Sequence, residues 1–457
     1  MTTEARLPVA HHPAVWAAGA LALYLVAAGG TWNEQSLAPH YVHLADALLH
    51  GQLELIDPTS EYDLLVTDGR AYVAGSPLPA VLLMPAVFLF GNQFSDILFS
   101  IVVGALNVGL VQALFRRPWL TILFALGTPH LYMAALGSVW LTAHLVALFF
   151  ALLALMAGWR HERMLLAGLL LGLAGLARPS VWFGIFFFVL FIWLRKRGRA
   201  RWRALALLGV PFTAGVALHL LYNLARFGGG LAGLLNFGYQ YTAGAPNIIA
   251  AYARYGGFHP RFLPCNLYVS LLNPPILFGA APPLLQSVCS YLLPGGSTTA
   301  PGLIVPNPLG MSLLLTTPAF LLLAGPALLA VRRKSPLLLS GWVGLLAIML
   351  PLWAYHNTGS LQFGYRYWMD AAPFWLLLLA VAYPPSASAT AEVTDGPTEA
   401  AKARPSTRLY PLLERLRLPL VALSCVINFW GFIWIYGHFT GRAWLGSWLA
   451  WLQAILS

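Results

Sequence analysis

Long apolar runs constrain the fold of this chain more than any other feature of its sequence. A helix needs about 20 mainly apolar residues to cross a bilayer, and runs of this kind recur along most of the chain. Only 9% of the residues are charged, against about a quarter in a soluble domain. We therefore predict an all-α polytopic membrane protein with about eleven transmembrane helices. The predicted spans are residues 14–30, 94–115, 119–136, 139–157, 164–177, 180–194, 204–224, 309–331, 336–354, 367–384 and 418–436.

The distribution of basic residues sets the predicted orientation, because cytoplasmic loops of membrane proteins are enriched in Lys and Arg. The spans place the amino terminus inside and the large loops outside the cytoplasmic (inner) membrane. The apolar segment 77–90 is treated as a juxtamembrane helix of the first outer loop, because a full crossing there would place the basic residues that follow it outside rather than in the cytoplasm. Few basic residues then lie outside: Arg70, Arg178, Arg226, Arg254, Arg261, Arg366 and Arg442.

These spans divide the chain into a transmembrane core and a C-terminal part. The core covers 1–384 and includes two outer loops, 31–93 and 225–308. A stretch rich in Ser, Thr, Ala and Pro predicts a disordered cytoplasmic loop at 385–417. Residues 418–457 hold the last span and an apolar tail, which is expected to lie in the outer interface of the bilayer.

Net charge and cysteine content narrow the class of protein further. The net charge of +11 is interpreted as the topology signal of a membrane protein, so no nucleic-acid partner is expected. Three cysteines are too few for a disulfide framework. Cys265 and Cys289 share the second outer loop, where two unlinked thiols are favoured over a disulfide, since sequence does not supply the required geometry.

Acidic residues gather in the first outer loop, next to the first span. Residues 40–53 there have the apolar spacing of an amphipathic helix, with His40, His43, Asp46 and His50 on its polar face. That face is expected to point toward water or an active-site cavity. Seven of the fifteen Asp and Glu residues lie in this part of the chain: Glu34, Asp46, Glu54, Asp57, Glu61, Asp63 and Asp68.

Asp46 and Glu34 are the candidate catalytic carboxylates. Asp46 stands on the predicted helix, where His43 and His50 are expected to orient it. Glu34 follows the first span closely and lies near the headgroup plane. The alternatives are a solvated helix face for Asp46 and a helix-terminating role for Glu34. Three other acids stand in turn-like settings and are interpreted as turn-forming residues rather than catalysts: Asp57, Asp63 and Asp68.

A second group of candidate site residues lies just before the tenth span. Arg366 is favoured as a phosphate ligand because guanidinium presents a planar fork of donors, and Gln362 and Tyr365 add hydrogen-bonding groups. The alternative is a local ion pair between Arg366 and Asp370, four residues further along. The remaining candidates for substrate binding are outer arginines and loop histidines: Arg70, Arg178, Arg261, His43 and His50.

Histidines within the predicted spans give a weaker signal. His130, His144 and His219 either mark a functional cavity or are neutral and hydrogen-bonded inside the bundle. Pro129, before His130, predicts a broken helix. The spacing of His43, Asp46 and His50 would suit a metal, but no fourth ligand can be identified, so no metal site is assigned.

The order of these parts resembles the GT-C class of polytopic glycosyltransferases, in particular its branch of bacterial protein mannosyltransferase-like and aminoarabinose transferase-like enzymes. Residues 39–51 (PHYVHLADALLHG) resemble the first-loop helix of that branch, and 76–80 (SPLPA) resemble its Pro-Pro segment. Residues 166–179 resemble its Gly/Leu-rich hairpin, and 365–373 its late Arg-Tyr and Pro motif. The resemblance covers most of 1–384.

The resemblance implies an inverting transfer of a sugar from a polyprenyl-phosphate-linked donor to an acceptor outside the cytoplasmic membrane. A carboxylate would take the proton of the acceptor hydroxyl, and cationic side chains would stabilise the departing lipid phosphate. No organic cofactor is implied, while a divalent cation stays open. The family commonly places an acid just before the Tyr of the first-loop helix, whereas 36–41 hold none. Glu34, Asp46 or another loop acid would have to take that role.

Two other classes of function are compatible with these features. A transporter or flippase of lipid-linked sugars would share the outer loops and outer arginines, but such folds more often show internal repeats and binding sites at the bilayer midplane. A non-enzymatic assembly factor would tolerate the loss of every loop acid. The clustering of acids in an outer loop favours an enzyme.

Overall fold

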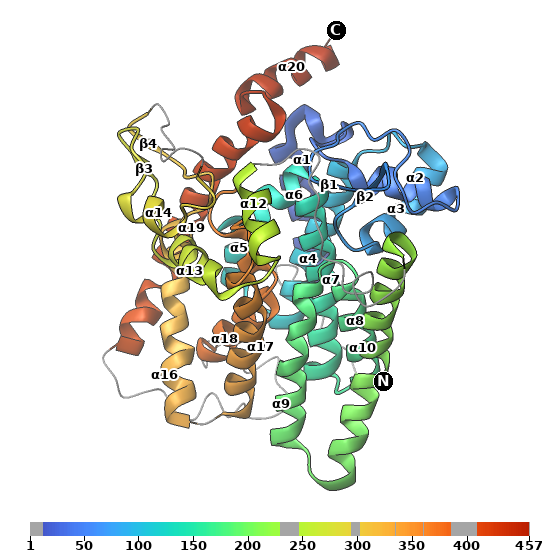
Figure 1. Cartoon of the computed structure of the whole chain (residues 1–457). Helices are drawn as coiled ribbons and strands as arrows, with labels where there is room; N and C mark the ends of the chain where they lie inside the picture. Colours follow the sequence, from blue (N-terminus) through green and yellow to red (C-terminus); the bar gives the residue numbers. More distant parts are fainter. Residues whose placement is uncertain are drawn as a thin grey trace.

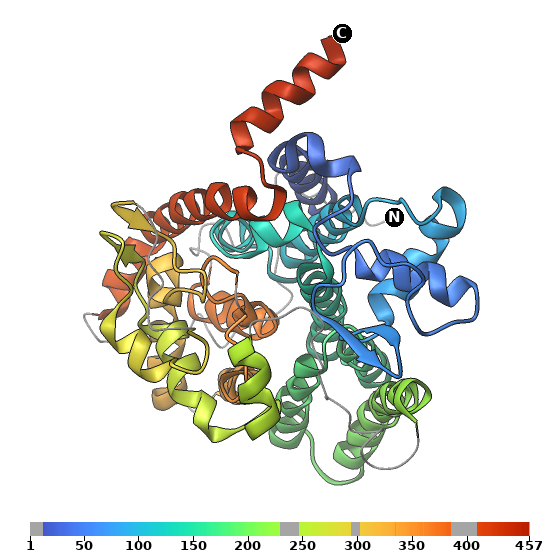
Figure 2. The ribbon, with the colours of Figure 1, turned by 45° about the horizontal axis from the view of Figure 1, so that its top comes forward.

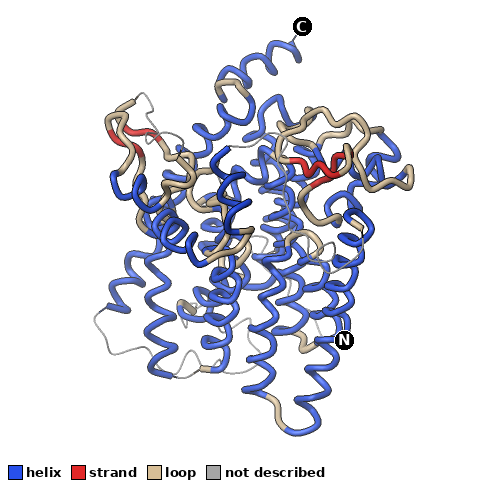
Figure 3. The backbone as a smooth tube through the Cα atoms, in the orientation of Figure 1, coloured by secondary structure: helices blue, strands red, loops and turns tan. Residues whose placement is uncertain are grey.

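The protein is a bundle of helices that run largely alongside one another, with its few strands gathered at one end (Figure 1; Figure 3). We describe it from a computed structural model, which covers residues 12–228, 246–293, 302–333, 335–359, 361–384 and 409–456. When the end that carries the strands is tilted toward the viewer, the first loop and the α12–α14 region lie on opposite sides of the central helices (Figure 2).

The first half of the chain contributes helices α1 to α10 and one β-hairpin. The strands β1 (Leu64–Thr67) and β2 (Arg70–Val73) pair antiparallel, with Leu64 opposite Val73. Short helical turns are η2 (Gly29–Asn33), η3 (Met156–Arg160) and η4 (Pro179–Gly184). The helices are α1 (Pro13–Ala28), α2 (His40–Leu49), α3 (Leu78–Phe90), α4 (Asp96–Phe115), α5 (Pro118–Leu126), α6 (His130–Leu136), α7 (Val139–Leu155), α8 (Met164–Gly175), α9 (Ile185–Arg195) and α10 (Gly198–Phe227).

The second half contributes helices α12 to α20 and a second short hairpin. The strands are β3 (Ile276–Leu277) and β4 (Ile304–Val305), and the short turns are η5 (Pro260–Phe262), η7 (Pro318–Leu323) and η8 (Arg366–Met369). The helices are α12 (Pro246–Tyr255), α13 (Leu263–Leu271), α14 (Pro283–Val288), α15 (Leu313–Thr316), α16 (Ala324–Arg333), α17 (Pro336–Trp353), α18 (Ala372–Ala382), α19 (Leu409–Thr440) and α20 (Trp444–Leu456).

The all-α polytopic class is confirmed, whereas the predicted number of crossings is not. Within the described residues, six helices are long and apolar enough to cross a membrane, or seven if α5 and α6 form one broken span. The axes of α5 and α6 meet at 56°. Pro129 lies at the break between them, where a proline interrupts helical hydrogen bonding. The other predicted spans correspond to shorter apolar helices, such as α8, α9 and α18.

Small residues let the helices approach closely on the side of the bundle that holds α8 and α10. A Cβ atom added at Gly168 of α8 would lie 2.0 Å from the carbonyl oxygen of Leu208 in α10. Such small residues at helix contacts are typical of packing inside membranes, where backbones approach without large side chains between them. Gly172 and Gly215 form a second contact of this kind between the same two helices.

Two expectations from the sequence are wrong. Cys265 of α13 and Cys289 at the end of α14 are joined by a disulfide, with their Cα atoms 4.9 Å apart. The two short helices pack together, which supplies the geometry that sequence alone could not show. Residues 409–417, predicted as the end of a disordered loop, form the first turns of α19. The rest of that predicted loop, 385–408, lies outside the described residues.

Candidate active site

The site begins with α2, whose polar face was expected to point toward water or an active-site cavity. His40 and His43 expose only 1% and 3% of their surface, so these two residues of that face do not point toward water. The segment after α2 folds back over them: His40 Nε2 lies 2.8 Å from the carbonyl oxygen of Tyr62, and His43 Nε2 lies 3.0 Å from Thr59 Oγ1. Both histidines thus hold the segment that leads to Asp63 against α2.

The same burial keeps the two rings neutral. It lowers the pKa of His40 to about 4 and also lowers the pKa of His43, with the Asp46 charge acting in the opposite sense. A neutral imidazole carries one N–H, and at His40 that hydrogen is donated from Nε2 to the Tyr62 carbonyl. These histidines hold backbone and side chains in place.

Asp63 lies at the end of this fastened segment, directly before β1. Its backbone is left-handed, with φ of 64°, and its side chain turns toward the start of α7. There Trp140 Nε1 donates a 2.6 Å hydrogen bond to Asp63 Oδ2, and the Tyr62 ring packs edge-on against the Trp140 ring. The start of α7 is tied to the first loop, since Val139 N donates to the Ala38 carbonyl over 3.0 Å.

The carboxyl group of Asp63 is held in a state suited to proton transfer. Burial raises its pKa to about 6, against the opposing effects of the Trp140 hydrogen bond and the positive charge of Arg366. A base works best when its pKa lies near the working pH. Asp63 is therefore ionised at neutral pH and is a stronger base than an ordinary aspartate.

Arg366 is the cation that acts on Asp63. It begins η8, and its backbone N–H donates to Gln362 Oε1 over 2.9 Å. The side chain exposes only 6% of its surface. Within the described part of the chain it forms no ion pair with an acid, and its buried Nε atom has no hydrogen-bond partner. A buried arginine without a counter-charge is costly, so this site favours an anion.

The local pair between Arg366 and Asp370, which was the alternative, does not form. Asp370 is taken up by Arg178, whose Nε donates to both carboxylate oxygens at 2.9 and 3.0 Å. His144 Nδ1 lies 2.5 Å from the same carboxylate, and Ser180 Oγ donates to it over 2.7 Å. With Asp370 fully engaged, Arg366 is left available.

Tyr367 lies between the two arginines. The guanidinium carbon of Arg178 lies 5.6 Å from the centre of its ring, and that of Arg366 lies 5.7 Å from it. Both distances are within the range of cation–π attraction. The Tyr367 ring thus attracts two positively charged side chains, near the loop that carries Asp63.

Other predicted site residues have supporting positions around Arg366. Gln362 accepts from Arg366 N and donates from Nε2 to the carbonyls of Leu309 and Thr358. The Tyr365 hydroxyl donates to Asn266 Oδ1 over 3.0 Å. Their polar groups are thus used to fix the η8 segment.

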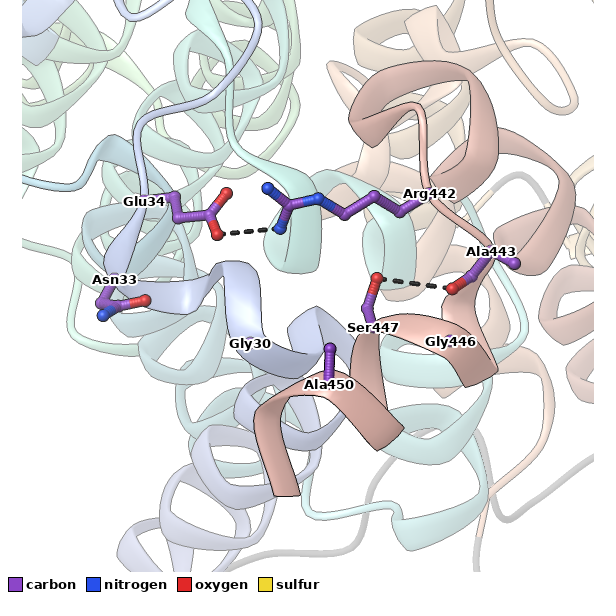
Figure 4. A pocket seen from close by; sticks show the side chains of 8 residues that line it. All are labelled: Gly30, Asn33, Glu34, Arg442, Ala443, Gly446, Ser447 and Ala450. Atoms are coloured by element: carbon purple, nitrogen blue, oxygen red, sulfur yellow. Dashed lines mark hydrogen bonds and ion pairs between the residues drawn. The ribbon is translucent and has the colours of Figure 1, made fainter. Parts of the chain in front are cut away.

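The two acids that were ranked first lie elsewhere. Glu34 forms a 2.8 Å ion pair with Arg442 beside α20. This pair lines a cavity of about 550 Å³, shown in Figure 4. Asp46 Oδ1 lies 3.7 Å from Nδ1 of the exposed His50. Neither acid is brought next to Arg366.

The other outer arginines that were candidates also stand apart from Arg366. Arg70 pairs with Glu54 over 3.3 Å on an exposed part of the β-hairpin. Arg261 lies over the Tyr255 ring, 5.3 Å from its centre. Of the outer arginines, Arg178 and Arg366 are those that share an aromatic ring in this site.

No group of three or more His, Cys, Asp or Glu residues within the described ranges has an arrangement that would hold a metal ion. The spacing of His43 and Asp46 in the sequence would suit a metal, but the two side chains have different partners. His43 is hydrogen-bonded to Thr59, and Asp46 lies beside His50.

Comparisons with known proteins give a distant likeness. No family model and no curated protein matches the chain. Among solved structures it is similar to ArnT from Cupriavidus metallidurans bound to undecaprenyl phosphate, with a TM-score of 0.46 and 13% identity, over 95% of this chain and 77% of that chain. It is also similar to the Archaeoglobus fulgidus oligosaccharyltransferase, with a TM-score of 0.45 and 14% identity, over 95% of this chain and 56% of that one. Both are GT-C glycosyltransferases, the class that the sequence motifs resemble.

Proposed function

We propose that this protein is a membrane glycosyltransferase that moves a sugar from a polyprenyl-phosphate-linked donor to an acceptor hydroxyl on the outer side of the cytoplasmic membrane. The observation that carries the proposal is the nearness of Asp63 to the charge of Arg366. A carboxylate with a raised pKa, about 6, stands within the electrostatic reach of a buried arginine that has no acid partner in the described part of the chain.

The proposed chemistry uses these two charges in one displacement. Asp63 takes the proton of the acceptor hydroxyl while the acceptor oxygen forms a bond to the anomeric carbon of the sugar. The bond from that carbon to the phosphate oxygen breaks, and its electron pair stays on the lipid phosphate. Arg366 stabilises the negative charge that develops there, as preorganised cations do in transfer reactions. Attack opposite to the leaving group inverts the anomeric configuration.

Asp63 takes the role that the sequence pattern offered to Asp46 or Glu34. The charge of Glu34 is already balanced by Arg442. Asp46 lies beside His50 at the C-terminal end of α2. We retain these two acids as the alternatives for the test below. No organic cofactor is proposed, because the donor itself carries an activated sugar. The divalent cation that the sequence left open is tested by chelation.

Two features support an outer position for the site. Disulfides form in oxidising compartments and are rare in the cytosol, and Cys265 and Cys289 lie in α13 and α14, at the end of the bundle that also holds β1 and β2 (Figure 1). The basic α9–α10 turn lies at the other end (Figure 1), as expected for a cytoplasmic face. A donor whose phosphate lies at the outer headgroup plane would reach Arg366 from the lipid.

The test is a transfer assay with purified protein in nanodiscs. A panel of short-chain polyprenyl-phosphate hexoses and pentoses is offered together with a cell-envelope extract as the source of acceptor hydroxyl groups, and the release of polyprenyl phosphate is measured by mass spectrometry with and without EDTA. The proposal expects release from at least one donor, lost in Asp63→Asn and retained in Asp46→Asn and Glu34→Gln. A transporter or flippase of lipid-linked sugars would instead move a donor across the bilayer without releasing lipid phosphate, and Asp63→Asn would leave that movement intact.

A further inference from the structure

A cluster of four arginines stands at the end of the bundle remote from the candidate active site. Arg116 ends α4 and Arg117 directly precedes α5. Arg160 ends η3, and Arg417 lies in the third turn of the long helix α19. The cluster therefore joins three segments that are far apart in the sequence.

The position of the cluster across the bilayer follows from α4. This helix begins at Asp96, whose carboxylate accepts hydrogen bonds from Ser36 in the first loop. It then runs for 20 residues, or about 30 Å at 1.5 Å per residue, which matches the hydrocarbon thickness of a membrane. The arginines at its far end thus lie at the opposite membrane surface.

The guanidinium groups are held in place by the protein. Arg160 Nη2 donates to the carbonyl of Leu114 in the last turn of α4 over 2.9 Å, and the same guanidinium lies over the Trp159 ring. Arg417 lies over the Trp119 ring, 5.1 Å from its centre. These contacts fix cations at a surface where basic side chains are usually free to move in water.

The cluster is not paired with an acid within the described residues. Glu414 lies three residues before Arg417 on α19, and both charges act on Tyr383, but no ion pair joins Glu414 to the four arginines. Arg117 and Arg417 each have a buried Nε atom with no hydrogen-bond partner in the described part of the chain. Burial, followed by the charges of Arg160 and Arg417, lowers the pKa of Arg117 to about 10. Four positive charges thus lie together with one nearby acid, which leaves the group in need of an anion.

We infer that this arginine cluster binds the phosphate of an anionic membrane lipid in the leaflet opposite to the candidate active site. Arginine matches phosphate through its fork of donors, and basic pockets between helices on the cytoplasmic side suit anionic headgroups. A lipid fits better than free phosphate, because exposed apolar side chains stand beside the charged residues in this part of α19: Leu412, Leu416 and Leu418. They give acyl chains a surface next to the charges.

The test measures lipid binding to the full-length protein, so it does not depend on the proposed transferase activity. The purified protein in neutral detergent is titrated separately with phosphatidylglycerol, phosphatidylcholine and inorganic phosphate, and bound lipid is read by native mass spectrometry. Each basic residue near an anionic surface contributes about 1 kcal/mol, so the double variant Arg117→Gln/Arg417→Gln is expected to lose about thirty-fold in phosphatidylglycerol affinity. The matched control is Arg199→Gln/Arg203→Gln, on exposed turns of α10 at the same end.

The outcomes separate the possible occupants. An equal loss in both double variants would mean a diffuse basic surface, and equal binding of phosphatidylcholine would mean no headgroup selection; either result overturns the proposal. If millimolar inorganic phosphate displaced all of the bound phosphatidylglycerol, the cluster would be a site for a free anion, and this result overturns the proposal as well. If wild type binds no phosphatidylglycerol but Glu392→Gln/Asp395→Asn/Glu399→Gln does, the cluster is occupied by these acidic side chains of the chain itself, which overturns the proposal. Should the glutamine pair fail to fold, Arg117→Lys/Arg417→Lys keeps the charges while removing the forks, and it is expected to bind less phosphatidylglycerol than wild type.

Discussion

Replacing Asp63 with asparagine separates a catalytic role from a structural one more sharply than any other change in this protein. Asparagine cannot take a proton, yet it has nearly the same shape and tolerates the left-handed backbone that Asp63 adopts, with φ of 64°. A general base contributes roughly 10²–10⁴ in rate. We expect Asp63→Asn to lose sugar transfer by a factor in this range while it still binds the donor.

The stability of the same variant is expected not to fall, and the magnitude follows from the structure. Burial raises the pKa of Asp63 from 3.8 to about 6. The folded protein therefore holds this proton more tightly than the unfolded chain, so it loses stability as the pH rises from about 4 to 6 and carries the full cost above 6. At about 1.4 kcal/mol per unit, that cost is on the order of 3 kcal/mol. This cost already includes the favourable hydrogen bond from Trp140 to the carboxylate. Asparagine cannot ionise and still offers an oxygen to Trp140, so Asp63→Asn is expected to be more stable than wild type at pH 7 by up to about 3 kcal/mol.

The measurements are the rate of lipid-phosphate release between pH 5 and 8 and thermal unfolding at pH 7. In wild type, kcat/KM is expected to rise as the pH increases through about 6, because the base works only as the carboxylate. Asp68→Asn is the matched control, since Asp68 has a similar backbone conformation but is exposed at the hairpin tip. If Asp63→Asn transferred sugar at the wild-type rate while Asp46→Asn did not, the argument from burial would be refuted and Asp46 would be the base.

Four further outcomes are expected. Trp140→Phe removes the hydrogen bond that lowers the pKa of Asp63, so the pH–rate profile should move toward higher pH without loss of donor binding. Arg366→Lys keeps the charge but loses the fork, and donor affinity measured by titration should fall roughly ten- to a hundred-fold, while Arg261→Lys should have little effect. Asp370→Asn removes the charge that balances a buried arginine, so thermal unfolding should show a loss of about 3–5 kcal/mol. Addition of EDTA should leave the rate unchanged if Arg366 alone neutralises the leaving phosphate.

Much of the fold could be predicted because its signals are local. The hairpin predicted at 164–177 and 180–194 corresponds to α8 and α9, and the apolar tail at 444–456 is α20. Hydropathy and the positions of Pro and Gly are properties of one segment, so they predict its structure without knowledge of the segments that pack against it. The number of crossings is different, because α5 and α6 meet at a break and α18 is short. Whether such pieces span the bilayer is decided by their neighbours.

Part of the site was also within reach of the sequence. Arg366 was identified as a candidate because an arginine predicted to lie outside is uncommon in a membrane protein, and this argument needs no partner; its binding of phosphate stays a prediction. The role of Asp370 was not, since its ligands Arg178, His144 and Ser180 come from three places in other helices and turns. A local pair four residues away was the simplest alternative, and tertiary packing replaced it.

Asp63 was set aside because its turn-forming role is correct but incomplete. Asp57, Asp63 and Asp68 all have left-handed backbones, a conformation that Asp and Asn adopt more readily than most residues. The backbone therefore cannot tell them apart, and what distinguishes Asp63 is its surroundings. It directly precedes the buried pair Leu64 and Leu65 of β1, whereas Asp68 occupies the tip of the hairpin. An acid that comes just before a buried strand is carried inward by that strand, so this position was the signal in the sequence that pointed to a carboxylate with a raised pKa.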